Sequence, residues 1–171
     1  AINGLGEQCR ALNLGLGRGE DRLRFTGGLD TVNHVLAEGE TTDNVLEVPV
    51  RPLDRVLEGQ SPTLMKIDVE GFETEVLAGA AQALSNPELL AVVMELNGSG
   101  ERYGFDEEAL HREMLERGFE TWRYRPFERT LEPLHGARSG SGNTVYVRDV
   151  TRLAERLRSA PRFRLGIGRE I

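Results

Sequence analysis

Residues 66–73 read Lys66-Ile-Asp-Val-Glu-Gly-Phe-Glu73, and they lie between an apolar stretch and a helical pattern. The apolar stretch Thr63–Val69 predicts a strand. The pattern that follows predicts a helix from about Gly71 to Leu84, because apolar residues recur there at every fourth position and form one buried face. These apolar residues are Phe72, Val76, Ala80 and Leu84. A strand that passes directly into an amphipathic helix is the basic unit of an α/β fold.

The rest of the chain repeats this alternation of strands and helices. Leu89–Leu96 is almost wholly apolar, which is typical of a central strand covered on both faces. Further strands are predicted at Cys9–Leu16, Asp21–Thr26, Val45–Val50, Glu120–Tyr124 and Asn143–Arg148. Further helices are predicted at Pro52–Leu57, Asp106–Gly118 and Thr151–Ser159, and Thr31–Thr42 is expected to be a loop or a short helix. We therefore expect an α/β domain with a parallel sheet over residues 1–150, followed by a basic helix and tail over 151–171.

Composition and charge limit the classes of function. The chain has 171 residues, of which 39% are hydrophobic, and it contains one cysteine, Cys9. No cluster of cysteine and histidine has metal-ligand spacing, no segment is apolar and long enough to span a bilayer, and the default setting is the reducing cytoplasm. The net charge of −7 argues against nucleic acid as the main partner.

The charge is unevenly distributed along the chain. From Thr151 to the end there are six arginines against two glutamates, a net charge of +4, which leaves −11 on the rest. A basic tail on an acidic body predicts that the tail folds back or forms a homo-oligomer by contacting a second subunit.

Three carboxylates follow two strands that we expect to be neighbours. Asp68 and Glu70 come at the end of the first strand, and Glu95 ends the second. Ligands of open α/β sheets bind outside the carboxyl ends of the strands, so these side chains are candidates for a site. An oxygen-only trio also suits magnesium, which leaves a metal-dependent hydrolase or phosphotransferase as an alternative.

Two longer blocks carry a family resemblance. Leu64-Met-Lys-Ile-Asp-Val-Glu-Gly-Phe-Glu-Thr-Glu-Val-Leu-Ala-Gly-Ala80, followed by Ala91-Val-Val-Met-Glu-Leu96, resembles the signature of FkbM-type methyltransferases. Pro52-Leu-Asp-Arg-Val-Leu57 and Gly142-Asn-Thr-Val-Tyr146 are similar to the family as well. The resemblance covers about residues 1–150.

The resemblance implies a class I methyltransferase fold, a Rossmann-like sheet in the strand order 3-2-1-4-5-7-6 with strand 7 antiparallel. It implies S-adenosyl-L-methionine as the cofactor and O-methylation of a hydroxyl on a sugar, a polyketide or another small molecule. It also implies an upstream glycine-rich loop and two strands that are not in this chain. We therefore expect the sheet to lack its first two strands and the natural protein to extend upstream. A non-catalytic remnant of the fold is the other alternative.

Gly15-Leu-Gly-Arg-Gly19 imitates a cofactor loop but leads into the alternating pattern of Asp21–Thr26. A cofactor loop must open a helix, whose first amides then face the ligand, so this stretch is not that loop. It matches the joint after strand 3, which in the class I fold passes beside the adenine. The resemblance thus implies cofactor contacts from Leu14, Gly15 and Leu16, with Asp68 on the methyl side.

The proton of an alcohol acceptor must be removed, and two residues are candidates for the base. Glu95 is one, and His34 is the other because histidine titrates near neutral pH. His34 follows Asn33 in a polar loop that could fold over the acceptor. We assign Asp68 to orienting the acceptor hydroxyl, and Glu70 and Asn33 to binding the substrate; Glu70 is also the residue expected to fix the strand-to-helix turn.

Overall fold

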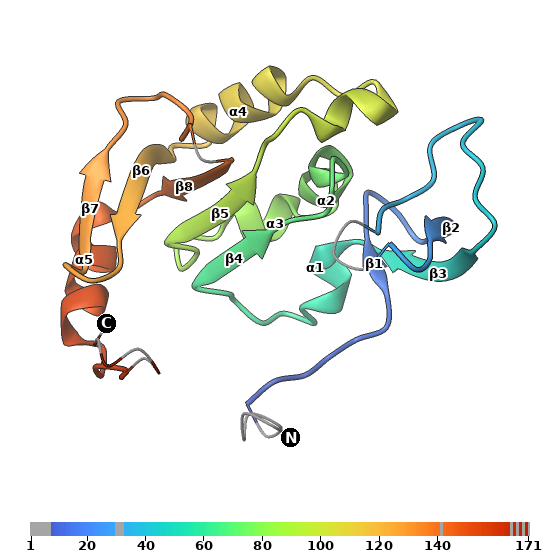
Figure 1. The fold of residues 1–171 in the computed structure, drawn as a ribbon. Coiled ribbons are helices and arrows are strands. Elements are labelled where there is room, and N and C mark those ends of the chain that lie inside the picture. The colour runs from blue at the N-terminus through green and yellow to red at the C-terminus, as the bar shows by residue number, and fades with distance from the viewer. Residues whose placement is uncertain are drawn as a thin grey trace.

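The computed structural model describes residues 8–29, 33–140, 142–164, 166, 168 and 170 (Figure 1). A small sheet contains β1 (Gly15–Leu16), β2 (Asp21–Thr26) and β3 (Val45–Arg51). A larger sheet contains β4 (Leu64–Ile67), β5 (Ala91–Glu95), β6 (Glu120–Arg125), β7 (Thr130–Pro133) and β8 (Asn143–Val147). The helices are α1 (Leu53–Val56), α2 (Glu73–Ala78), α3 (Ala81–Ser85), the 3₁₀ segment η2 (Ser99–Tyr103), α4 (Glu107–Glu116) and α5 (Val150–Ser159). Within the described ranges, no helix has the length and apolar character that a bilayer-spanning segment needs.

The larger sheet has the strand order β4-β5-β8-β6-β7. Strands β4 and β5 are parallel, and β8 lies antiparallel between β5 and β6. This is the 4-5-7-6 part of the class I order with its antiparallel strand 7, as the family resemblance implied. In the described chain β4 is an edge strand, so the positions of strands 1 and 2 are not filled.

The hydrophobic core lies between one face of the larger sheet and helices α2, α3 and α4. Met65 and Ile67 of β4 alternate with exposed residues and point into this core, as a half-buried strand requires. Helix α4 begins at Asp106, whose carboxylate accepts hydrogen bonds from the backbone N–H groups of Glu108 and Ala109. The helix predicted over Asp106–Gly118 is therefore present, and its first residue is the N-cap.

The single helix predicted from Gly71 to Leu84 is wrong, because the structure contains two short helices that are broken at Gly79. A side chain at Gly79 would meet the carbonyl oxygen of Gly17 at 2.1 Å, so the backbone of another segment crosses there. The carboxylate of Asp54 accepts hydrogen bonds from the N–H groups of Gln82 and Ala83 and starts α3 as a new helix. Both interactions are long-range, and the local pattern carries no sign of them.

The strand predicted over Cys9–Leu16 is reduced to Gly15–Leu16, since residues 8–13 are exposed. This short strand pairs in parallel with β3 and does not join the larger sheet. Strand β7, which forms a hairpin with β6, was not predicted. The range Thr31–Thr42 is irregular where it is described and pairs with β2 only through a bridge between Phe25 and Val35.

Helix α5, predicted over Thr151–Ser159, folds back onto the chain. Arg152 forms a two-bond ion pair with Glu88, which precedes β5. Arg129, in the β6–β7 turn, donates hydrogen bonds to the last carbonyl groups of the helix region, at Leu157, Ala160 and Pro161. A cation that binds the carbonyl end of a helix also interacts favourably with its dipole.

A buried polar pair connects α4 to the sheet. The Nε2 atom of His111 lies 2.9 Å from the carbonyl oxygen of Gly136, and its Nδ1 atom lies 2.9 Å from the hydroxyl of Tyr146. Because a carbonyl can only accept, Nε2 carries the proton and Nδ1 accepts from the tyrosine. Tyr146 is fully buried, and burial raises the pKa of its hydroxyl.

We predict that Tyr146→Phe lowers the free energy of unfolding by about 1–3 kcal/mol, because it leaves Nδ1 of His111 buried without a donor. Urea denaturation measures this change. The control is Tyr124→Phe, at a tyrosine that is 36% exposed, and it should have little effect. Equal stabilities of the two variants would contradict the prediction.

Candidate functional site

The segment Asp68–Glu73, here called the carboxylate turn, links β4 to α2 through two residues in the left-handed region. Glu70 has φ 54° and Gly71 has φ 100°. A side chain at Gly71 would meet the carbonyl oxygen of Ser99 at 2.4 Å, so the turn lies directly against η2. Arg102 of η2 also donates to the carbonyl oxygen of Glu70. Only glycine fits the second position of this turn.

Glu73 fixes the carboxylate turn, rather than Glu70 as the sequence suggested. Its side chain is 2% exposed, and Oε1 accepts hydrogen bonds from the N–H groups of Val69 (3.2 Å) and Gly71 (3.4 Å). Burial raises the pKa of the Glu73 carboxyl; the hydrogen bonds oppose this shift, and the nearby Glu107 carboxylate adds to it. A glutamate in the first turn of a helix that reaches back to preceding amides is a known capping signal, which could have identified this residue from the sequence.

Asp68 and Glu95 end neighbouring parallel strands at the same level. Ile67 of β4 is in register with Met94 of β5, and each carboxylate is the next residue on its strand. Asp68 is 46% exposed and forms an ion pair with Lys66 at 3.0 Å. Glu95 is half-buried and accepts a hydrogen bond from the amide of Asn97. The predicted placement of these two carboxylates at one sheet edge is therefore confirmed.

The trio Asp68, Glu70 and Glu95 does not come together as a metal site. Across the described ranges, no three histidine, cysteine or carboxylate side chains are grouped closely enough to hold an ion. All three residues lie within these ranges, so the geometry gives no support to the metal-dependent alternative.

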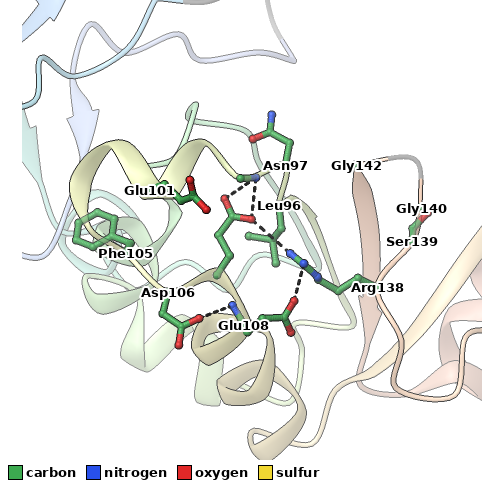
Figure 2. A pocket seen from close by; sticks show the side chains of 12 residues that line it. Leu96, Asn97, Glu101, Phe105, Asp106, Glu108, Arg138, Ser139, Gly140 and Gly142 are labelled. Carbon is green, nitrogen blue, oxygen red and sulfur yellow. Dashed lines mark hydrogen bonds and ion pairs between the residues drawn. The ribbon is translucent and has the colours of Figure 1, made fainter.

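A cavity of about 850 Å³, here called the edge pocket, opens beyond the end of β5 (Figure 2). Its walls come from the segment after β5, the start of α4 and the loop between β7 and β8. Its lining includes Leu96, Asn97, Glu101, Phe105, Arg138 and Gly142. Glu95 borders this pocket, because Asn97 bonds to its carboxylate and Gly142 lies beside the same oxygen.

Glu107 and Arg138 hold the walls of the edge pocket together. Both carboxylate oxygens of Glu107 accept from the N–H of Gly98 at 3.0 Å, and one also accepts from Gly100. Arg138 crosses from the β7–β8 loop and contacts Glu107 at 3.3 Å and Glu108 at 2.5 Å. One guanidinium between two carboxylates thus fixes a long loop to the first turn of α4, where negative charge also favours the helix dipole.

The structure places His34 and Asn33 in the packing of the small sheet. His34 is 7% exposed, and its Nε2 atom lies 2.9 Å from Oε1 of Glu40. The hydrogen bond with His34 is the main cause that lowers the pKa of Glu40. Asn33 accepts from the N–H of Leu29 and from the hydroxyl of Thr26. The roles proposed for these two residues stay predictions.

One contact does connect this loop to the candidate site. The hydroxyl of Tyr103 in η2 donates to the carbonyl oxygen of Val35 at 2.7 Å. Tyr103 also packs edge-on against Phe72, with ring centroids 5.3 Å apart. The loop after His34 is therefore held to the segment that contacts Glu70, although local sequence patterns gave no sign of it.

A smaller cavity of about 300 Å³, here called the hairpin pocket, has a lining that begins at Gly17, so it does not include Leu14, Gly15 or Leu16. Its lining includes Gly17, Arg18, Gly19, Leu23, Phe72 and Glu75. The glycines lead into β2, as predicted, and they do not open a helix. Leu16 packs against the core, and the space over Gly15 is filled by Val50 and Phe25. Phe72 lines this pocket, which the sequence did not indicate.

The chain is similar to known proteins of one family. Residues 7–121 match the family model described as methyltransferase FkbM domain. Among solved structures, the chain is similar to a methyltransferase FkbM from Methylobacillus flagellatus KT, with 17% identity and a TM-score of 0.49. That match covers 85% of this chain and 30% of the other, so the chain spans about a third of that protein's length. Among curated proteins, none matches significantly.

The buried Glu73 predicts a characteristic pH dependence of stability. Because its pKa is raised on folding from the ordinary 4.5, the folded chain binds this proton more readily than the unfolded chain. Its contribution to stability therefore falls as pH rises from about 4.5 through the raised value. Glu73→Gln removes this contribution, so the stability of the wild type relative to the variant should decrease across that interval and then level off.

Urea unfolding at a series of pH values measures this difference. Glu116→Gln, at an exposed position on α4, is the control and should run parallel to the wild type. Parallel curves for Glu73→Gln as well would show that Glu73 titrates as it does in the unfolded chain.

Proposed function

From the premise that this chain belongs to the FkbM methyltransferase domain family, we propose that it is part of an S-adenosyl-L-methionine-dependent O-methyltransferase. The acceptor would be a hydroxyl of a sugar, a polyketide or another small molecule. The observation that carries the proposal is the pairing of Asp68 and Glu95 at one level of the sheet edge, with Glu95 bordering the edge pocket.

The residues in this chain fit part of the cofactor. S-adenosyl-L-methionine supplies an electrophilic methyl group when it is bound. The hairpin pocket has apolar surface from Leu23, Val50 and Phe72, which suits a flat aromatic ring. Its volume of about 300 Å³ lies at the lower end for ligand pockets. The residues of the hairpin pocket and the carboxylate turn have no counterpart of the family's glycine loop or of its ribose-binding acid. We therefore assign to this chain only the contacts with the adenine and with the methyl group of the cofactor.

The edge pocket is the proposed acceptor site. Its volume suits a small organic molecule, and Leu96 and Phe105 give it an apolar surface among polar groups. Asp68 would orient the acceptor hydroxyl, since its carboxylate is exposed at the end of β4. Glu70, next in the turn, and Asn33, on the loop tied to η2, keep their proposed roles in binding the substrate.

Glu95 is the preferred residue to accept the hydroxyl proton. It is half-buried and next to the pocket, whereas His34 is buried and already bonded to Glu40. The protein would otherwise align the two reactants and exclude water. The leaving group needs no further activation, because the sulfonium of the cofactor already carries a positive charge.

We further propose that the partners are small molecules and a second copy of the chain, with no role for nucleic acid or membrane, in the cytoplasm. Helix α5 is anchored to its own chain, but Arg156 and Arg158 on the helix and Arg162 and Arg164 after it are exposed. Their charge complements the acidic body of another copy, so the tail supports a homo-oligomer.

We predict that Asp68→Asn reduces turnover about a hundredfold or more in a protein that also carries the cofactor loop, because the oriented charge is lost. Stability should change little, since the side chain is half-exposed. Asp43→Asn makes the same chemical change in an exposed loop and should leave methyl transfer intact. Activity within about twofold of wild type would remove Asp68 from the mechanism.

We also predict that the isolated 171-residue chain gives no measurable heat when titrated with S-adenosyl-L-methionine. It offers surface for the adenine and the methyl group but not for the ribose. A protein that includes the glycine loop should bind the same compound. Micromolar binding by the isolated chain would contradict the partial fit and would locate the whole cofactor site within these residues.

A further inference from the structure

The edge pocket is a molecule-sized cavity with a strongly acidic lining. Its charged lining residues are Glu101, Asp106, Glu107, Glu108 and Arg138, which sum to −3. In Figure 2 the single guanidinium of Arg138 lies among these carboxylates, and it already contacts Glu107 and Glu108. A ligand in this cavity therefore meets a negative potential that its one cation does not offset.

The hydrogen-bonding groups of the pocket also favour a ligand that donates hydrogen bonds over an anionic one. The N–H groups of Gly98 and Gly100, which an anion would otherwise use, donate to the carboxylate of Glu107. The amide of Asn97 donates to Glu95. A ligand carboxylate or phosphate would have to displace one of these internal acceptors, whereas a ligand rich in donors can use the carboxylate oxygens directly.

The apolar part of the lining suggests how such a ligand would lie. Phe105 lies on the wall of the cavity, and its ring packs against Tyr103 on one side, with centroids 5.7 Å apart. An aromatic face can pack against the C–H surface of a saturated ring and attracts a neighbouring cation. A ligand that suits both parts of the lining has a saturated ring with C–H faces and carries hydrogen-bond donors around it. A cyclic polyol, such as a sugar, has this combination.

We propose that the edge pocket selects an acceptor that carries a protonated amine beside its hydroxyls, an amino sugar or a similar amine-bearing polyol, and rejects carboxylated or phosphorylated acceptors. The proposal rests on the proposed function only in treating this ligand as the methyl acceptor. Glu101 is the specificity-determining residue, because its carboxylate lies at the exposed wall of the cavity, where it would meet the ammonium group.

Three sugars of one ring type test the selection: glucosamine, glucose and glucuronate, which are cationic, neutral and anionic. Each is titrated into the ¹⁵N-labelled chain at low salt and slightly acid pH, and the amide shifts are followed by NMR. We expect shifts at Asn97, Gly98 and Gly142, with glucosamine binding about threefold or more tighter than glucose, the scale of one exposed charge pair. Glucuronate should bind more weakly than glucose, and added salt should reduce the difference.

A matched pair of variants tests the residue. Glu101→Gln keeps the shape and removes one charge, so it should abolish most of the preference for glucosamine over glucose. Glu116→Gln makes the same change at the far end of α4, outside the pocket, and should keep the preference.

Four results would each overturn the proposal: glucuronate binding as tightly as glucosamine, shifts that map to another surface, an unchanged preference in Glu101→Gln, or no binding of any of the three sugars. The experiment needs no methyl donor. Its failure therefore leaves the methyltransferase proposal standing, and a failure of methyl transfer leaves a positive binding result intact.

Discussion

The hydrogen bonds from the N–H groups of Val69 and Gly71 to the buried carboxylate of Glu73 are the constraint on which the candidate site depends. They hold two consecutive residues in the left-handed region, a conformation that costs free energy at Glu70. This turn determines where Asp68 leaves the sheet and brings the bare backbone of Gly71 against η2. If the turn changed conformation, the end of β4 and the η2 wall of the edge pocket would no longer be held in fixed positions relative to each other.

A second carboxylate repeats the arrangement on the other side of η2. Glu107 binds the N–H groups of Gly98 and Gly100, as Glu73 binds those of its own turn. The two carboxylates are near enough for Glu107 to raise the pKa of Glu73, so their repulsion opposes the fold. The backbone amides and Arg138 offset this repulsion, and in doing so they fix three separate segments around one cavity.

The family resemblance implied the strand order β4-β5-β8-β6. Local patterns in the sequence were sufficient for the level of Asp68 and Glu95, because apolar periodicity locates the two strands and parallel strands end at the same edge of a sheet. They were insufficient wherever a distant segment decides the outcome. The crossing of Gly17 over Gly79 divides a periodic helix, and the hydrogen bond from Tyr103 to Val35 holds the loop after His34 to η2. Glu70 and Glu73 are the same residue type, but only Glu73 stands in the first turn of a helix, from which a glutamate can reach back to the preceding amides.

The environments of the two paired carboxylates suit different tasks in the proposed reaction. Asp68 is exposed at the end of β4 and forms an ion pair with Lys66, so its carboxylate is open to a hydroxyl group and suits orientation of the acceptor. Glu95 is half-buried and borders a cavity whose other carboxylates give a negative potential, and from this position it can reach the hydroxyl proton of an acceptor. An acceptor that brings its own positive charge would lower that potential when it binds. The ammonium group that gives the specificity would then also make Glu95 a weaker base. For one pocket to select the acceptor and to remove its proton, the ammonium must lie near Glu101 and away from Glu95.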